Sequence, residues 1–300
     1  MRILRQKQYW LEHFNDAKYE EYRKKINDEF GKLEFYEGPH EYYLNGRKLD
    51  CVSDVTHIFK QPFDAESASY NTWRAHFNDE SSIYYQKTQE EIKVMWKENS
   101  ERACKQGSER HEFAESCFYF MSAQYDKILP DFRDRLITDE EGLGFRADLA
   151  KEEAVVRVYE DFPDYMIPIL AENKIFNITD DYAYAGTFDI LFYFEAELAG
   201  MKPERSGFYV LDWKTNKDLY NWKGQYMVAP FDGYEQMDVN VYKLQLSLYQ
   251  LAIEKLGFKV IMRELFWLRP TGNYEKVKLE DLSKRLDEAL KASFWLHFTK

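Results

Sequence analysis

Cysteine, glycine and proline are all scarce in this 300-residue chain. The three cysteines, Cys51, Cys104 and Cys117, contain no CxxC pair. That number and spacing fit a reducing compartment and argue against a zinc or iron–sulfur site. Because there are only 13 glycines and 8 prolines, we expect mostly regular structure with few long loops.

Long apolar runs are also missing. No stretch approaches the roughly 18 consecutive apolar residues that a membrane span needs, and the opening MRILRQKQYWLEHF lacks the apolar core of a signal peptide. We therefore expect a soluble, cytoplasmic protein without a membrane partner. Hydrophobic residues still make up 45% of the chain and aromatic residues 17%, which is enough for a core and excludes global disorder.

An excess of positive charge is absent too. The chain has 41 Lys and Arg against 53 Asp and Glu, a formal net charge of −12. Phosphates are repelled by a negative surface, so this balance argues against a protein that coats nucleic acid non-specifically. It leaves room for a metal-dependent nuclease, which needs only a local basic track and whose metal ligands are themselves acidic.

The hydrophobic pattern predicts helices first, then a series of strands, then helix, strand and helix. The predicted helices cover residues 3–30, 53–59 with Ser53 as the cap, 89–125, 238–256 and 279–296. The predicted strands cover 154–160, 170–178, 182–194, 207–213 and 259–268, after a hairpin over 33–49 turned by Asn45-Gly46. This order predicts an α/β fold with a mixed central sheet flanked by helices. Residues 1–85 would form an α-rich N-terminal extension and residues 86–300 the core.

Two predicted strands carry the residues that point to chemistry. Asp189 lies in the apolar run AGTFDIL, and Asp212 lies in FYVLDWKT, two residues before Lys214. Residues two apart in a strand project from the same face, so neighbouring strands could gather these three side chains at one sheet edge. Phosphodiester cleavage needs such a cluster, because carboxylate oxygens hold Mg²⁺ and an ammonium offsets charge on the phosphorane.

An acidic residue two positions before a lysine is a weak pattern by itself. It occurs at Asp16/Lys18, Glu91/Lys93, Glu172/Lys174 and Asp212/Lys214. The first two lie in predicted helices and indicate solvated surface. Glu172/Lys174 lies on a strand and is a rival, but only Asp212/Lys214 follows a Gly-x-x-Asp strand and precedes a Gln-containing helix.

Two helices carry further candidates. The helix after Lys214 places Tyr242, Gln245 and Tyr249 on one face, where Gln245 could bind the attacking water or the phosphate. The earlier long helix places Gly107 and His111 on one face, where His111 could touch a metal or a phosphate. The alternative for Gln245 is a polar residue at the margin of the core. The alternative for His111 is a structural histidine.

These residues resemble motifs of the PD-(D/E)XK nuclease superfamily, in particular its RecB-like exonuclease branch, including phage-encoded members. The similar elements are Gly107 to His111, Glu172, Gly186 to Asp189, Asp212 to Thr215, and Gln245 to Tyr249. Their order and rough spacing agree over residues 107–249. Phe188 stands where many relatives have proline.

The resemblance implies a role for each residue. Asp189 and Asp212 would bind Mg²⁺, or Mn²⁺ in its place, with the Trp213 carbonyl as a further ligand. Lys214 would be the catalytic lysine. The site would be completed by Glu172, His111 and Gln245, the first two also as metal ligands. The four-cysteine cluster of some relatives is missing, so we expect no iron–sulfur cofactor.

The segment after Lys214 interleaves aromatic residues with lysines. This composition suits single-stranded DNA, by stacking plus attraction to the backbone, although an aromatic loop packed on the fold is the alternative. The predicted nucleic-acid contacts are Lys217, Trp222, Lys223 and Tyr249. The expected function is that of an exonuclease in DNA processing, recombination or repair, in a bacterial or phage-infected cell and on DNA with free ends. A restriction-type or structure-specific endonuclease, and a non-catalytic member that binds nucleic acid, are the alternatives.

Overall fold

The computed structural model describes residues 2–297, with side chains as far as residue 292. The chain forms two compact units. One runs up to Lys60 and resumes at His111, and the other comprises Gln61–Arg110. The expected boundary between an α-rich extension over residues 1–85 and a core over residues 86–300 stays a prediction.

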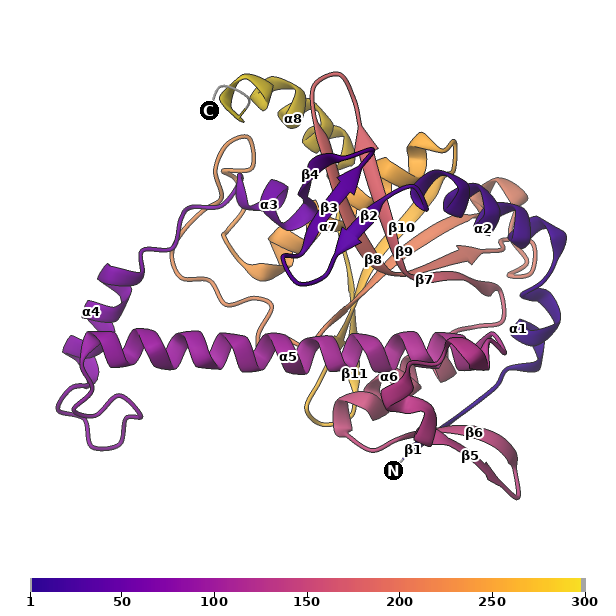
Figure 1. Cartoon of the computed structure of the whole chain (residues 1–300), viewed down its shortest axis with the longest axis horizontal. Coiled ribbons are helices and arrows are strands. Elements are labelled where there is room, and N and C mark those ends of the chain that lie inside the picture. Colours follow the sequence, from indigo (N-terminus) through magenta and orange to yellow (C-terminus); the bar gives the residue numbers. More distant parts are fainter. Residues whose placement is uncertain (1, 298–300) are drawn as a thin grey trace. The chain divides into compact units, whose positions relative to one another are not determined.

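A mixed sheet forms the centre of the larger unit (Figure 1). Its eight strands are β2 (Glu34–Tyr36), β3 (Glu41–Leu44), β4 (Arg47–Cys51), β7 (Met166–Ile178), β8 (Ala183–Phe194), β9 (Gly207–Lys214), β10 (Val260–Leu268) and β11 (Tyr274–Lys278). The order is β11-β10-β9-β8-β4-β3-β2, and β7 pairs with β8. The pairs β9–β10 and β4–β8 are parallel and the others antiparallel. The predicted α/β fold with a mixed sheet flanked by helices is therefore confirmed.

Helices build two hydrophobic cores with this sheet. One core receives side chains from α2 (Ala17–Phe30), α3 (Val52–His57), α7 (Asp238–Lys255) and α8 (Ser283–His297). The other receives them from α1 (Gln8–His13), the end of α5 (Gln89–Met121) and α6 (Ala150–Asp161). Long apolar strands such as β8 are buried by both cores, which explains their near-continuous hydrophobic sequence.

Smaller elements complete the described chain. A second sheet has the order β1-β6-β5, from β1 (Arg2–Arg5), β6 (Gly142–Ala147) and β5 (Leu136–Asp139). Three 3₁₀ turns cover Tyr125–Lys127, Pro130–Arg135 and Pro203–Arg205. The smaller unit holds α4 (Ala65–His76) and the first turns of α5. Among the described helices, none combines the length and apolar character that a bilayer span requires.

The strand predicted over 154–160 is wrong, because these residues belong to helix α6. Val155, Val156 and Val158 favour strands intrinsically, yet all three are buried in a helical arrangement. The carboxylate of Glu152 accepts hydrogen bonds from the backbone N–H groups of Asp148 and Leu149 at 2.8 and 3.1 Å and so closes the first turn. Packing and this cap outweigh the strand propensity.

The single helix predicted over 3–30 is also wrong in part. The segment divides into β1, α1 and α2, and only the last of these is long. The short helix that follows begins at Val52 with Cys51 as its cap, so Ser53 is not the cap. In contrast, the predicted turn at Asn45-Gly46 is confirmed. Its φ angles of 52° and 77° fit the two-residue turn that joins β3 to β4.

Strand β8 has an unusual edge that matters for the site. Its start pairs with β4 at Tyr184 and Ala185, and its end pairs with β9 from Ile190 onward. Between these two ladders, Gly186 to Asp189 face the place where β4 and β9 diverge. A polar side chain can enter the sheet there without breaking a ladder hydrogen bond.

Candidate metal centre

Three acidic residues form a row across neighbouring strands of the central sheet. The β7–β8 register places Glu172 opposite Asp189. The last β8–β9 pair joins Ile190 to Leu211, and the next residues beyond it are Asp189 and Asp212. Directly opposite residues on neighbouring strands have Cβ atoms only about 5 Å apart, so the sheet itself concentrates three carboxylates.

Asp189 is the centre of this row and is only 7% exposed. Its Oδ2 accepts a hydrogen bond from the backbone N–H of Trp213 at 2.7 Å and lies 3.2 Å from Nδ1 of His111. The pairing of β8 with β9 ends at Ile190 and Leu211. Beyond that point the Asp189 carboxylate, rather than a backbone carbonyl of β8, accepts the hydrogen bond from the Trp213 N–H. In a strand, the N–H and C=O of one residue point to the same side, so the Trp213 carbonyl is also directed toward Asp189.

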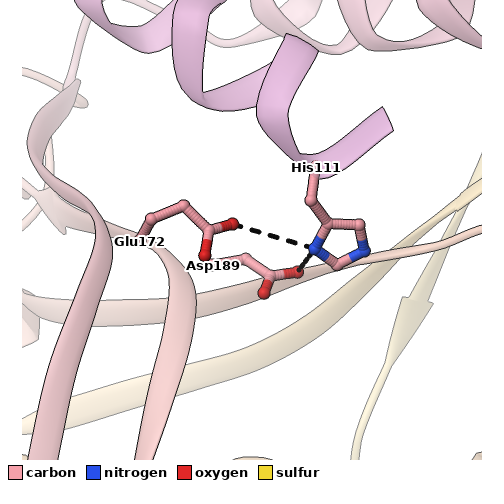
Figure 2. Close-up of side chains that lie close together, drawn as sticks. All are labelled: His111, Glu172 and Asp189. Atoms are coloured by element: carbon pink, nitrogen blue, oxygen red, sulfur yellow. Dashed lines mark ion pairs between the residues drawn. The ribbon is translucent and has the colours of Figure 1, made fainter. Parts of the chain in front are cut away.

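His111 joins the row from helix α5 (Figure 2). Its Nδ1 lies 3.8 Å from Oε1 of Glu172 as well as close to Asp189. Glu172 adopts a φ of 45°, in the left-handed region that non-glycine residues rarely enter. Such a backbone costs on the order of 1–3 kcal/mol and is typical of functional sites. Ligand atoms of His111, Glu172 and Asp189 lie within 4.8 Å of one another, so this group could hold a metal ion.

Asp212 and Lys214 extend the cluster along β9. Asp212 is 1% exposed, and the Lys214 ammonium forms an ion pair with its Oδ2. Even so, neither oxygen of Asp212 has a partner with hydrogen-bond geometry among the described residues. The Lys214 Nζ also lies 4.2 Å from the centre of the Tyr242 ring, in cation–π contact. The ammonium is therefore held between a carboxylate and an aromatic face.

The charges of the cluster shift one another's pKa values. Burial raises the pKa of Asp212 to about 7, and the Asp189 charge adds to this rise. Burial would also raise the pKa of Asp189, but His111 and Lys214 lower it to about 2. Burial raises the pKa of Glu172 to about 7.

The two cationic groups are shifted in the opposite sense. Burial would lower the pKa of His111, but the charges of Asp189 and Glu172 raise it well above its usual value. Burial would likewise lower the pKa of Lys214, and the charge of Asp212 raises it instead. Without a metal, the site therefore contains more carboxylate than its own cations neutralise, and protons make up the difference.

This donor set fits a divalent cation. Carboxylate and carbonyl oxygens are preferred by Mg²⁺ and Mn²⁺, and an imidazole is acceptable to Mn²⁺. Oε1 of Glu172 and Oδ1 of Asp212 are buried without a hydrogen-bond partner among the described residues. Unsatisfied buried oxygens are costly, and a cation bound between the strands would satisfy them.

The Gly-x-x-Asp strand and the Gln-x-x-x-Tyr helix touch each other. A Cβ atom built on Gly186 would lie 2.8 Å from Cγ2 of Val52 and 3.2 Å from Cε1 of Tyr249. Tyr249 in turn accepts a hydrogen bond from Nε2 of Gln245 at 2.9 Å. The glycine is thus required because α3 and α7 approach β8 too closely for any side chain.

We expect Gly186→Ala to lower the free energy of unfolding by about 1–3 kcal/mol, the usual cost of overpacking a core. The matched control is Gly38→Ala, because a Cβ at Gly38 meets nothing within 4 Å. Urea unfolding of both variants measures the difference. Equal stability of the two variants would show that α3 and α7 shift without cost.

The predicted nucleic-acid residues divide into two groups. Lys217, Trp222 and Lys223 lie on the exposed segment between β9 and α7. Tyr249 is only 4% exposed and belongs to the core. The structure corrects its predicted role, because a buried ring cannot stack on a base, and Tyr249 instead holds the amide of Gln245.

Two residues near Lys214 were not assigned a role from the sequence. The helical spacing placed Tyr242 on the same face as Gln245 and Tyr249. Its contact with Lys214, however, depends on how α7 crosses β9. The Tyr242 hydroxyl donates to Oδ1 of Asn216 at 3.1 Å, and Nδ2 of Asn216 donates to Asp238 at 2.7 Å. An aromatic residue seven positions before the motif tyrosine, Tyr249, would have been too common a signal to identify this network.

No family model and no curated protein matches this chain. Among solved structures it is similar to one from Eubacterium rectale described as a “Putative exonuclease”, with a TM-score of 0.36 and 15% sequence identity. The likeness covers 65% of this chain, and the chain spans 65% of the length of that protein. A TM-score this low carries no weight for fold or activity, so any function has to rest on the site itself.

Proposed function

We propose that this protein is a metal-dependent deoxyribonuclease that acts as an exonuclease in DNA processing, recombination or repair. The observation that carries the proposal is the cross-strand row of Glu172, Asp189 and Asp212 with the Lys214 ammonium beside it. The order of the sequence motifs supports it independently, because residue type and spacing along the chain point to the same residues without reference to their positions in space.

Asp189, Asp212, Glu172 and His111 would hold Mg²⁺, or Mn²⁺ in its place, together with the Trp213 carbonyl. When bound, the cation polarises the phosphodiester and makes water a stronger acid. Without the cation, the Glu172 and Asp212 carboxyls have pKa values raised to about 7, so binding of the cation near neutral pH would displace protons from them.

Lys214 acts as a fixed positive charge. The raised pKa of its ammonium keeps it protonated, so it serves as a hydrogen-bond donor rather than as a general base. It would orient the attacking water or offset the charge that develops on the phosphorane. Tyr242 and Asp212 restrict the position of the ammonium, which lowers the entropy lost when it meets the phosphate. Gln245, fixed by Tyr249, would contact the water or the phosphate.

The deciding experiment offers end-labelled linear single- and double-stranded DNA and a closed circle to the purified full-length protein, with Mg²⁺, Mn²⁺ or EDTA. We expect loss of the linear substrates with either metal, survival of the circle, and no cleavage in EDTA. Asp212→Asn, which keeps the side-chain volume but removes the charge, should be inactive. Cleavage of the circle would favour the endonuclease alternative. A folded protein that binds DNA and cuts nothing with either metal would leave only the non-catalytic alternative.

A further inference from the structure

The segment between β9 and α7, residues 215–237, is a long loop that begins directly after Lys214 (Figure 1). Three of its apolar side chains, Leu219, Met227 and Phe231, are buried in the core. Backbone hydrogen bonds fix it further, including one from Val228 N–H to the Phe59 carbonyl at 2.9 Å. The loop is thus anchored to the fold along its length.

Three aromatic residues of this anchored loop nevertheless face solvent. Tyr220 is 50% exposed, Trp222 44% and Tyr226 49%. The indole N–H of Trp222 donates to the Gln225 carbonyl at 2.8 Å, and its ring lies 5.7 Å from that of Tyr226. These rings are held in place without being buried, which leaves apolar area available to a ligand.

The base of the loop adds a stacked cation. The Tyr220 ring lies 6.1 Å from that of Trp267, and the Arg269 guanidinium lies 3.8 Å from the centre of the Trp267 ring. The indole N–H of Trp267 donates to the Asn216 carbonyl at 2.8 Å, which ties this stack to the start of the loop. The loop therefore starts directly after Lys214 and lies beside a stacked guanidinium, which also pairs with Glu275 at 3.4 Å.

The loop itself is not strongly basic. Lys217 and Lys223 are exposed, but Asp218, Asp232 and Glu235 lie on the same segment. A duplex presents mainly its phosphates, because its bases are already stacked on one another. The chain has a net charge of −12 and the loop adds little positive charge, so both would attract these phosphates only weakly. Unpaired bases present their faces, and stacking on aromatic rings needs little net charge.

We propose that residues 215–237 bind single-stranded nucleic acid, with unpaired bases stacked on Tyr220, Trp222 and Tyr226. Lys217, Lys223 and Arg269 attract the backbone. The inference rests on the proposed function and deepens it, because a strand lying along this loop continues into the Asp212–Lys214 end of β9. Because stacking supplies much of the affinity, binding should depend on salt less steeply than in a basic groove.

The test measures binding of fluorescein-labelled dT15 and of a 15-base-pair duplex by anisotropy, in EDTA, with the full-length chain. We expect dT15 to bind at least tenfold more tightly than the duplex. Trp222→Ala should weaken dT15 binding by about 5- to 150-fold, the range typical of one lost stacking contact, while Trp222→Phe should retain most of the affinity. Tyr36→Ala is the control, since Tyr36 is an aromatic residue of similar exposure, 50%, on strand β2.

Equal affinity for dT15 and the duplex, or an unchanged affinity in Trp222→Ala, would overturn the proposal. Hydrolysis of thymidine 5′-(p-nitrophenyl phosphate) by the wild-type protein with Mn²⁺ reports on the chemistry separately, because this small substrate offers no strand to the loop. If it is hydrolysed while dT15 is not bound, the loop proposal fails and the proposed function stands. If dT15 is bound but no phosphodiester is cleaved with any metal, the proposed function fails and the loop proposal stands. Binding of neither nucleic acid would point to a protein partner for the exposed rings.

Discussion

Replacing Lys214 with alanine should lower kcat for DNA cleavage by about 10²- to 10³-fold, the usual effect of removing one preorganised donor from a charged transition state. The ammonium is fixed by the Asp212 carboxylate and the Tyr242 ring, so its loss removes a donor that is already positioned. KM should change much less, because a charge that acts mainly in the transition state contributes little to ground-state binding. Single-turnover cleavage of labelled DNA with saturating Mg²⁺ measures this directly.

Lys174→Ala is the matched control for that experiment. Lys174 follows Glu172 in the same acidic-x-Lys pattern and lies on strand β7, where its register partner is Thr187. We expect Lys174→Ala to keep near wild-type activity. If Lys174→Ala is inactive and Lys214→Ala is not, the catalytic lysine belongs to the rival pattern. Circular dichroism of both variants shows whether each is folded.

Metal affinity should fall at least tenfold for each pH unit below about 7, since each proton that a cation displaces contributes one factor of ten per unit. Glu172 and Asp212, whose pKa values are raised to about 7, are both protonated below that pH, and His111 with its raised pKa is charged. All three must lose a proton before they can bind a cation.

The stability of the metal-free protein should change with pH in the opposite direction. Glu172 and Asp212 bind protons more tightly when folded than in the unfolded chain, where carboxyl pKa values are about 4. The folded state therefore loses stability as pH rises from about 4 to 7. His111 contributes stability below about pH 6.5 that is lost as pH rises through its raised pKa. The lowered pKa of Asp189, about 2, adds stability that is fully present above about pH 4 and is lost as pH falls from about 4 to 2.

Calorimetric titration with Mn²⁺ at pH 5.5, 6.5 and 7.5, and thermal unfolding with EDTA or Mn²⁺ at each pH, measure both effects. The increase in Tm on adding Mn²⁺ should be largest at pH 7.5. Asp212→Asn should bind Mn²⁺ more weakly and with a shallower pH dependence, because one titrating ligand is gone. An affinity independent of pH would mean that these carboxyls are not the ligands.

The sequence was most informative where local pattern and tertiary environment agree. Strands β8 and β9 are apolar on both faces and lie in the middle of the sheet, so an isolated aspartate in each was conspicuous. The alternation of a strand was enough to place Asp212 and Lys214 on one side. Glycine and asparagine at the β3–β4 turn have a direct backbone cause, the positive φ that such a turn requires.

The sequence failed where long-range packing decides the local structure. The valines of α6 favour a strand by propensity, and only the core formed with α5 and the sheet makes them helical. The burial of Tyr249 could not be predicted either, because it follows from the close approach of α7 to Gly186. A motif tyrosine looks the same in sequence whether its ring faces a ligand or the core.

By itself, the sequence identified the residues that we propose carry the chemistry and placed Asp189, Asp212 and Lys214 on two strands, because residue type and strand alternation are local properties. Only the tertiary structure decided that Glu172, Asp189 and Asp212 share one row, that His111 joins it from α5, and that Tyr242 holds Lys214. Register, strand divergence and helix crossing depend on contacts between segments far apart in the chain. The mutual pKa shifts arise from the same contacts, so they too exist only in the folded protein.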